Sequence, residues 1–340
     1  MRTPAFILVL TAVAAALYFA FNFLGNDYLF FAGYTVLQYI VLATAWNILG
    51  GYCGYVNFGS AGFFAIGVYT TIFFHTVSQQ IDTLVPEFLV APMQLIFPLP
   101  LPILIVLAGM VAGLVGLGMG YLTLRLRGVF FAIATLALTV VLETFIVNWS
   151  FVGGSRGAYV IPPNEVAVFG NFIHFLFALM LLLVIVALTT ARLIERSKLG
   201  VGFATIRDDE LAAEASGVPT LRLKLVATVV SGALMGMAGA PFPFYIGYVE
   251  PASAFNLSYA VNSIAMPMIG GTTSWVGPLV GALLLGTLQQ VATVTISSAV
   301  NLLIVGLLLI FFVIIAPRGI VGLVQDWMRK GRESRKETKS

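Results

Sequence analysis

The stretch VFFAIATLALTVVLETFIVN, residues 129–148, carries one charged side chain, Glu143. About 20 helical residues cross a hydrocarbon core of roughly 30 Å, so this stretch is long and apolar enough to span a membrane. In the whole chain 60% of residues are hydrophobic and 9% are charged, whereas soluble domains average about 45–50% and about 25%. Because backbone amides in lipid must pair within their own segment, the sequence predicts an all-α polytopic membrane protein.

Similar apolar stretches recur along the chain. We predict ten transmembrane helices, over residues 5–24, 28–49, 55–75, 100–123, 129–148, 171–192, 224–244, 257–272, 276–297 and 299–316. The eighth is short and contains Pro267. The first could be mistaken for a signal peptide, but it is long for one, and we interpret it as a retained helix.

The positions of the basic residues predict which ends of the helices are cytoplasmic. All 17 Lys and Arg except Arg156 fall at Arg2, in 125–127, in 192–224 and in 318–339. Cytoplasmic segments are enriched in these residues. Ten spans put all four clusters and both termini on the cytoplasmic side, whereas losing the eighth span would move the basic tail outside. We therefore predict a transmembrane domain over 1–323 and a cytoplasmic tail over 324–340.

The longest cytoplasmic connection, 193–223, contains GFATIRDDELAAEASGVPT at 202–220. Thr205 followed by Asp208 resembles a capping box, Gly217 is placed to end a helix and Pro219 to prevent its continuation. A short helix over about 206–216 follows, with Leu211, Ala212 and Ala215 on one side. Two interpretations stay open: a docking helix for a soluble partner, and a solvated connector.

Glycines gather in two groups, within 50–67 and within 270–286. Such groups favour close helix packing or an interrupted helix that lines a transport pathway, and both interpretations stay open. The groups occupy corresponding parts of the two halves, which suggests an inverted repeat of five helices each. An intramembrane carboxylate is also a functional candidate. The pathway candidates are Asn57, Ser60, Glu143, Thr272 and Thr273.

The chain lacks the sequence patterns of the common enzyme classes. It has no H-E-x-x-H metal motif, no G-x-S-x-G and no nucleotide-binding G-x-x-x-x-G-K-[ST]. His75 and His174 have no ligand-type neighbours, so no metal site is expected. The sequence therefore predicts neither an enzyme nor an ATPase, and the scarcity of intramembrane charges argues against an ion-coupled carrier. The net charge of +3 is no sign of nucleic-acid binding.

Several segments resemble a known family in order along the chain. They are NILGGYCGYVNFGSAGFFAIGVYT, LRLRGVFFAIATLAL, GGSRGAYVIP, ATIRDDELAAEASGVPTLRLKL and IAPRGIVGL. Each is similar to a segment of the inner-membrane permease subunits of branched-chain amino acid ABC importers. The chain departs from that family at Arg156, where an acidic residue is common, and at Val152, where threonine is common.

The resemblance implies a type II-like importer permease in a bacterial inner membrane. It implies a heterodimer with a homologous permease, two cytoplasmic ATPases that use ATP, a periplasmic binding protein, and no cofactor on this chain. The implied ATPase-coupling residues are Arg207, Asp208, Asp209, Glu210, Leu211, Ala212, Ala213, Glu214, Ala215 and Gly217, and the implied outer-loop residues are Gly153, Gly154, Ser155 and Arg156. Relatives that import urea or short amides are an alternative, as are, outside the family, a stand-alone ion-coupled carrier and a structural subunit without a pathway.

Overall fold

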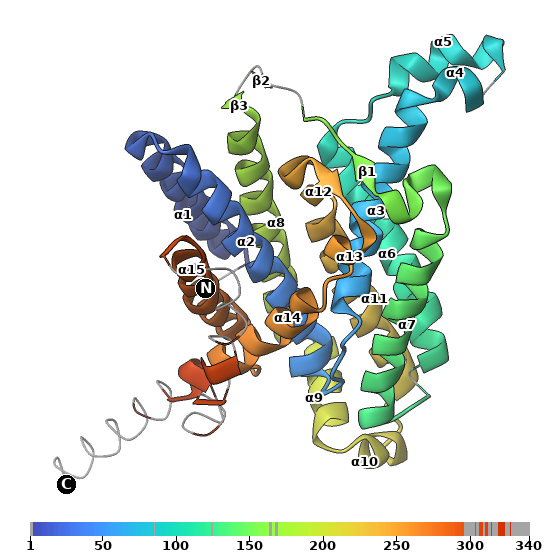
Figure 1. The fold of residues 1–340 in the computed structure, drawn as a ribbon. Helices are drawn as coiled ribbons and strands as arrows, with labels where there is room; N and C mark the ends of the chain where they lie inside the picture. The colour runs from blue at the N-terminus through green and yellow to red at the C-terminus, as the bar shows by residue number, and fades with distance from the viewer. Residues whose placement is uncertain are drawn as a thin grey trace, which may run out of the picture.

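The fold is a bundle of long apolar helices, seen in a computed structural model (Figure 1). The structure describes residues 3–84, 86–123, 125–162, 165–166 and 169–295, together with 303, 306–308, 310, 311, 314, 319–323 and 327. Eight helical segments among these are long and apolar enough to cross a membrane. They are α1 (Thr3–Leu24), α2 (Asp27–Asn47) with the π-helix η1 (Ile48–Tyr52), α3 (Ser60–Gln79), α6 (Leu101–Thr123), α7 (Val129–Val147), α8 (Phe172–Glu195), α11 (Thr220–Gly239) with α12 (Phe242–Ile246), and α15 (Val276–Thr295).

The eight segments correspond to eight of the ten predicted spans. The predicted span 257–272 forms α14 (Leu257–Gly270), a helix of 14 residues that is too short to cross a bilayer alone. The short α13 (Pro251–Ala254) precedes it. Most of the predicted span 299–316, and all of the tail 324–340 except Trp327, lie outside the described residues. The total of ten therefore stays a prediction.

Short elements cap the two ends of the bundle (Figure 1). One end, called the α10 end, carries α9 (Lys198–Asp208) and α10 (Glu210–Ala215). The other, called the β1 end, carries the antiparallel pair β1 (Ala158–Tyr159) and β4 (Tyr248–Val249). It also carries the pair β2 (Glu165–Val166) and β3 (Gly170–Asn171), the helices α4 (Ile81–Leu84) and α5 (Glu87–Ile96), and the 3-10 turns η2 (Ser150–Val152) and η3 (Gly154–Arg156).

The placement of the charges agrees with the predicted sidedness where the structure describes them. Arg127 pairs with Glu214 of α10 at 3.0 Å, so two basic segments meet at the α10 end. Phe6 near the start of α1 packs against Arg192, whose guanidinium lies 3.8 Å from the ring centre. At the β1 end Asp27 lies 3.0 Å from His174. The second and third predicted basic clusters thus meet at the α10 end of the bundle.

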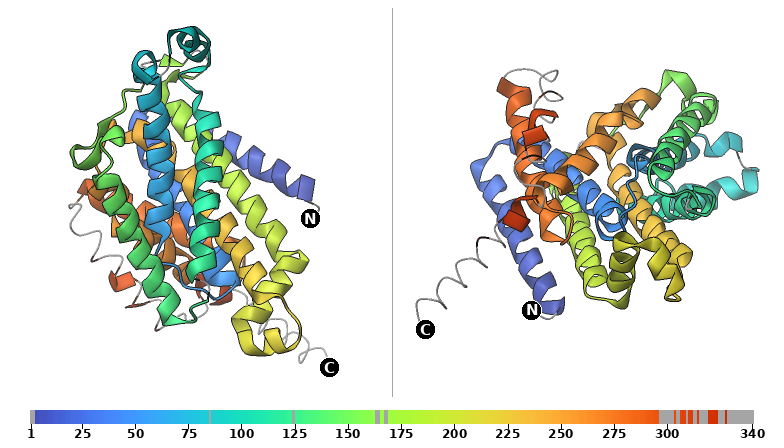
Figure 2. Two further views of the ribbon diagram at one scale, coloured as in Figure 1. Left: turned by 90° about the vertical axis from the view of Figure 1, so that its right-hand side faces the viewer. Right: turned by 90° about the horizontal axis from the view of Figure 1, so that it is seen from below.

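Small residues allow the central helices to touch through their backbones. A Cβ added at Gly67 of α3 would lie 1.9 Å from the carbonyl oxygen of Gly236 in α11, and one at Gly236 would lie 2.3 Å from the Cβ of Ala112 in α6. Figure 2 shows α3 between α6 and α7 in its left view. The packing interpretation of the first glycine group is correct at Gly67, because no larger side chain fits there.

The second glycine group also serves close packing. A Cβ at Gly277, in the first turn of α15, would lie 1.6 Å from the Gly271 carbonyl oxygen, and one at Gly281 would lie 1.8 Å from that of Met266. These contacts close the α14–α15 hairpin. Gly319 returns to the same place, because its Cβ would lie 2.4 Å from the Gly271 nitrogen. Helix α15 runs for 20 residues from the neighbourhood of Gly271 to Thr295. Thr295 and Gly319 therefore lie near opposite ends of α15. A tenth span over 299–316 requires this separation.

The two glycine groups do not sit at opposite ends of the bundle, as an inverted repeat would need. A Cβ at Gly51 would lie 2.7 Å from the Thr272 carbonyl oxygen, so both groups meet on the same side. A better pair of counterparts is found in the two irregular connections. The first connection consists of η1 and residues 53–59 and joins α2 to α3. The second runs from α12 through β4 to α13 and joins α11 to α14 at the β1 end. The inverted repeat of five helices each stays a prediction.

Candidate functional site

The predicted docking helix exists, but it begins later than the sequence suggests. Thr205 does not cap it, because its hydroxyl donates to the Gly202 carbonyl within α9 at 2.8 Å. The chain leaves the helical conformation at Asp209 (φ −159°, ψ 109°), whose carboxylate accepts from the Ala212 amide at 3.0 Å. Asp209 is therefore the N-cap of α10, and Arg207 and Asp208 end α9 instead.

The predicted C-terminal stop is confirmed at Gly217. This residue has φ +82°, its amide donates to the Glu214 carbonyl at 3.0 Å, and the Val218 amide donates to the Ala213 carbonyl at 3.0 Å. Together these bonds form a Schellman motif, which satisfies carbonyls left free at the helix end and favours glycine at the left-handed position. Helix α10 thus has defined caps at both ends.

The exposed side of α10 presents a leucine. Leu211 is 64% exposed, Ala212 and Ala215 are exposed beside it, and Ala213 is buried at 5%. A short capped helix that presents a leucine has the form of an element that docks into an apolar groove of a partner. Among the predicted coupling residues, Ala213 packs inward against the bundle instead.

A buried ion pair fixes α10 to the bundle. Lys224, at 3% side-chain exposure, lies 2.7 Å from the carboxylate of Glu210. The Lys224 ammonium also lies 3.1 Å from the Tyr55 hydroxyl, and that hydroxyl donates to Glu210. Each of the three residues comes from a different segment: α11, α10, and the loop between η1 and α3. We call them the Lys224–Glu210–Tyr55 triad.

Burial and charge act in opposite directions on the triad. Partial burial raises the pKa of Glu210, but hydrogen bonds from Lys224 and Tyr55 outweigh it and leave that pKa below its usual 4.5. Burial, and then the neighbouring Glu210 carboxylate, raise the pKa of Tyr55. At neutral pH Glu210 is therefore ionised and Tyr55 is neutral, and each of the two has a hydrogen-bond partner within the triad.

More exposed contacts attach α10 to two further helices. Glu214 accepts from Arg127, just before α7, at 3.0 Å, and from the Thr220 hydroxyl at the start of α11 at 2.8 Å. On the α9 side, Arg207 donates to the Gly51 carbonyl of η1 at 3.4 Å. A displacement of α10 would therefore be felt by α7, by α11 and by the η1–α3 connection.

The sequence analysis did not single out Lys224, Tyr55 or Arg127. The spacing of these residues could have indicated the contacts. Glu210 and Glu214 are four positions apart, as are Thr220 and Lys224, so each pair lies on one face of its helix. The charges of the first pair complement the donors of the second. Tyr55 carried no such signal, because its partner lies 155 positions away in the chain.

A cavity of about 520 Å³ lies beside the triad. Its walls come from residues 53–58, the start of α7 and the junction of α9 with α10, and include Cys53, Arg207 and Glu210. Cys53 is the lone cysteine and is 1% exposed. Burial raises the pKa of its thiol to about 12, although Lys224 acts in the opposite direction. The thiol is therefore protonated and unreactive at neutral pH.

Two of the predicted pathway residues are buried and have local structural contacts. Asn57 is 1% exposed and Ser60 is fully buried. The Asn57 side chain accepts from the Gly59 amide at 2.7 Å, and the Ser60 hydroxyl donates to the Asn57 carbonyl at 3.5 Å. These bonds organise the turn into α3. Neither side chain reaches an accessible surface, and the Asn57 amide nitrogen has no partner among the described residues. A pathway role for the two residues stays a prediction.

The remaining pathway candidates do not form one cluster. Thr272 and Thr273 lie in the turn between α14 and α15, where Glu195 accepts from the Trp275 amide at 2.9 Å. That turn is at the α10 end. Glu143, partly exposed, lies four residues before the end of α7, toward the β1 end. The position of Glu143 near the end of its predicted span agrees with this placement.

The predicted outer-loop residues lie at the β1 end. Gly153, Gly154, Ser155 and Arg156 form the compact turn of η2 and η3, with Ser155 and Arg156 exposed. The backbone carbonyl of Arg156 accepts from the Tyr248 hydroxyl at 2.6 Å. The loop is thus attached to β4, the strand that leads into α13.

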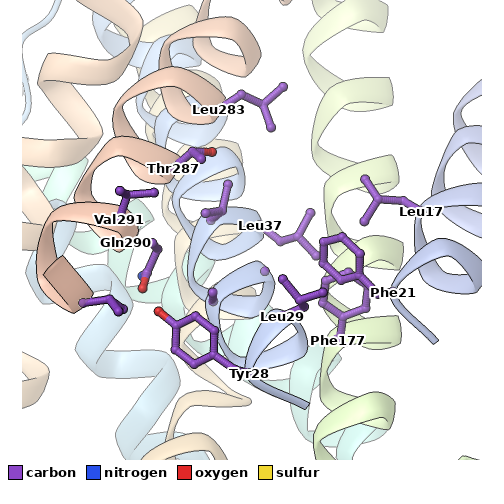
Figure 3. A pocket seen from close by; sticks show the side chains of 14 residues that line it. Leu17, Phe21, Tyr28, Leu29, Leu37, Phe177, Leu283, Thr287, Gln290 and Val291 are labelled. Carbon is purple, nitrogen blue, oxygen red and sulfur yellow. The ribbon is translucent and has the colours of Figure 1, made fainter. Parts of the chain in front are cut away.

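An apolar groove of about 410 Å³ lies between α1, α2, α8 and α15. Figure 3 shows Leu17, Phe21 and Phe177 on one wall, with Thr287 and Gln290 on the opposite wall. Its lining is almost wholly apolar, so it suits a lipid chain better than a charged solute. Within the described part of the chain, no three His, Cys, Asp or Glu side chains gather into a metal site.

Comparisons with known proteins give a consistent result. The family described as "branched-chain amino acid transport system / permease component" matches residues 28–313. The chain is similar to the high-affinity branched-chain amino acid transport system permease protein LivM of Salmonella typhimurium, and to that of Escherichia coli. Both are 26% identical over 317 residues, covering 86% of this chain and 69% of the relative. It is also similar to a probable branched-chain amino acid transport permease protein LivH of Methanocaldococcus jannaschii, 26% identical over 69% of this chain and 76% of that one. No solved structure matches the chain.

Proposed function

Because the chain belongs to the family of branched-chain amino acid transport permeases, which are transporters and not enzymes, we propose that it is one membrane subunit of an ABC importer for branched-chain amino acids. The observation that carries this proposal is α10, a capped helix with an exposed leucine that a buried ion pair fixes to the bundle. The chain has no nucleotide-binding loop. A chain without its own nucleotide-binding loop needs a contact with a separate ATPase, and α10 has the form of such a contact.

The proposed partners are a second permease, two ATPases and a binding protein. Similarity to both LivM and LivH relatives supports pairing with a homologous subunit. The ATPases would hold α10 through Leu211 and use the ATP, and this chain would bind no cofactor. The binding protein would deliver the solute at the β1 end, near the loop of Ser155 and Arg156. The complex would reside in a bacterial inner membrane, with the α10 end and both termini cytoplasmic.

The triad gives this proposal a mechanism. When the ATPases close, α10 moves with them, and the Lys224–Glu210 pair transmits the displacement to α11. Tyr55 transmits it to the connection between η1 and α3, and Arg127 to α7. Rigid transmission needs side chains that cannot rearrange, and a buried, fully hydrogen-bonded ion pair meets that need better than exposed pairs, which contribute about 0–1 kcal/mol. The result is alternating access, with the pathway opening first outward and then inward.

The test is ATP-driven uptake by the reconstituted complex. The chain is expressed with the permease, ATPases and binding protein encoded beside it, and radiolabelled leucine, urea and a short amide are offered to proteoliposomes. We expect leucine uptake that depends on ATP and on the binding protein. Uptake of urea or the amide in place of leucine would assign the alternative substrate, and uptake by this chain alone under an ion gradient would refute the ABC assignment.

A variant at Leu211 tests the docking role of α10. Burying a leucine side chain contributes about 1.5–3 kcal/mol, so Leu211→Ala should weaken binding of the ATPases roughly tenfold or more. Leu24→Ala is the matched control, because Leu24 is equally exposed, at 64%, and ends α1 near Asp27 at the β1 end. The measurement is the amount of ATPase that co-purifies with each variant. Equal recovery for both variants would contradict the docking assignment.

A further inference from the structure

The two glycine groups meet through their backbones at the α10 end. A Cβ added at Gly51 of η1 would lie 2.7 Å from the carbonyl oxygen of Thr272, in the turn between α14 and α15. A glycine lets two backbones approach closely, but it provides no side chain that could hold them together. The two segments can therefore separate unless another group fastens them.

The side chain of Glu195 joins these two segments. Glu195 is the last residue of α8, and its Oε2 atom accepts from the Trp275 amide, at the end of the α14–α15 turn, at 2.9 Å. The same oxygen accepts from the hydroxyl of Tyr52, the last residue of η1, at 3.4 Å. Hydrogen bonds to a carboxylate are roughly twice as strong as those between neutral groups. One oxygen atom thus connects α8, η1 and the turn that leads into α15.

The Trp275 side of this junction is held more firmly than the Tyr52 side. The Trp275 ring packs edge-on against that of Phe6, with 4.9 Å between the ring centres. The Arg192 guanidinium lies 3.8 Å from the ring centre of Phe6 and 5.9 Å from that of Trp275. These contacts attach the turn to α1 and α8 even without Glu195. The junction is therefore weakest at the longer bond, between Tyr52 and Glu195.

The π-helix η1 is also connected to the docking region. Arg207, in the last turn of α9, donates to the Gly51 carbonyl at 3.4 Å, and the triad holds the loop that follows η1. A π-helix is a rare conformation that is frequent at functional sites. A displacement of α10 therefore acts on η1 from one side, while Glu195 holds η1 from the other.

From this arrangement we propose that Glu195 is a positioning residue of the import cycle, a latch that keeps the α10 end of the bundle closed. While α10 is at rest, the carboxylate holds η1 against the α14–α15 turn. When the ATPases displace α10, Tyr52 parts from Glu195, and the two glycine-rich segments separate on the cytoplasmic side. This inference rests on the proposed function and adds the group that closes the cytoplasmic side again. Glu195 acts through Tyr52 and does not bind the solute.

The first test compares leucine uptake with ATP hydrolysis in the complete importer. Tyr52→Phe removes the donor, Glu195→Ala removes the acceptor, and Glu195→Gln keeps an oxygen that can accept. Loss of a hydrogen bond to a charged group costs roughly tenfold, so we expect Tyr52→Phe and Glu195→Ala to lower uptake per ATP about tenfold. Glu195→Gln should retain part of it. Tyr121→Phe is the control, because the Tyr121 hydroxyl on α6 also has a charged partner, Arg125, at 3.3 Å.

The second test follows the position of η1 through Cys53 and needs no transport. Cys53 directly follows η1 and is 1% exposed. In the complete complex without ATP, we expect a maleimide to label this thiol about tenfold faster in Tyr52→Phe and Glu195→Ala than in Tyr121→Phe, because η1 opens locally once the latch is lost. The midpoint of thermal unfolding should stay the same in all three variants. Faster labelling with a matching loss of thermal stability would indicate general destabilisation and overturn the latch.

The outcomes separate the two proposals. If the unmodified complex takes up no leucine, the proposed function fails. If it takes up leucine, and Tyr52→Phe and Glu195→Ala match Tyr121→Phe in uptake per ATP and in labelling, the latch is overturned while the function stands. Glu195→Gln as impaired as Glu195→Ala would show that the charge matters and the hydrogen bond does not, which would also overturn the latch.

Discussion

At the scale of single residues, Lys224 has the largest consequences. Its ammonium is almost fully buried, yet three segments far apart in the chain depend on it. Burying a charge is unfavourable unless it is paired and hydrogen-bonded, so the pair is stable only while all members of the triad are present. Because the three side chains are held together in this way, a displacement of α10 moves α11 and the η1–α3 connection with it.

Replacing Lys224 with methionine should leave the Glu210 carboxylate poorly compensated. We expect Lys224→Met to lower the free energy of unfolding by about 3 kcal/mol. We also expect it to uncouple ATP hydrolysis from uptake. Thermal unfolding in detergent and coupled transport assays measure the two effects. Arg127→Gln, whose side chain is 49% exposed, should cost about 1 kcal/mol or less. Equal losses in the two variants would show that burial of the triad is unimportant.

The lowered pKa of Glu210 predicts a dependence of stability on pH. A carboxyl group with a lower pKa in the folded state stabilises the fold above its unfolded pKa and loses that contribution as pH falls through the folded value. The loss should therefore occur below the usual value of 4.5. Unfolding followed from pH 7 downward should show a shallower loss for Glu210→Gln than for the unmodified chain. Parallel curves would contradict this assignment.

The buried thiol of Cys53 predicts slow chemical modification. Its raised pKa of about 12 and its burial keep the thiolate population negligible at pH 7. We expect a maleimide to label the folded chain slowly and the denatured chain rapidly, measured as a mass increase. Because no other cysteine is present, the label reports this position alone, and rapid labelling of the folded chain would refute the burial.

At the scale of elements, α10 depends on its two caps more than on its length. Six residues form too short a helix to be stable alone. Asp209 satisfies its first turn, the motif at Gly217 satisfies its last, and the triad supplies the tertiary contact. The sequence predicted the helix and its end, but placed the start too early because Thr205 and Asp208 imitate a capping box inside α9.

The end of α10 can be tested with a single methyl group. Gly217→Ala places a side chain in the left-handed conformation, which costs about 1–2 kcal/mol, although nothing lies within 4 Å of the added Cβ. We expect reduced coupling between ATP hydrolysis and uptake with normal insertion of the chain. Gly118→Ala in α6 also meets nothing within 4 Å and should be neutral or stabilising. Normal coupling in Gly217→Ala would show that the cap is dispensable.

At the scale of the whole molecule, backbone contacts between helices hold the bundle together. Lipid supplies no hydrophobic force between helices, so close packing of small residues takes its place. The contact of Gly67 with Gly236, and of Gly236 with Ala112, joins α3, α6 and α11 into one unit. The triad is attached to this unit through α11, which carries Lys224.

This packing predicts a severe effect of a larger side chain at Gly67. Gly67→Val would place atoms inside the Gly236 carbonyl, and we expect loss of folded protein, measured by size-exclusion chromatography and protease resistance. Gly286→Val is the control, because the nearest atom to its Cβ lies at 3.6 Å. A well-folded Gly67→Val chain would mean that α3 and α11 are farther apart than described.

The sequence by itself determined the membrane class, eight of the helical spans, the grouping of two basic clusters at one end, and the cap at Gly217. These follow from local chemistry, because hydrophobic length, charge bias and glycine conformation act within a few residues. The tertiary structure decided the rest. It buried Asn57 and Ser60, moved the start of α10 to Asp209, and brought Tyr55, Glu210 and Lys224 together. Those contacts join residues far apart in the chain, and only the packing of α3, α7 and α11 determines which side chains meet.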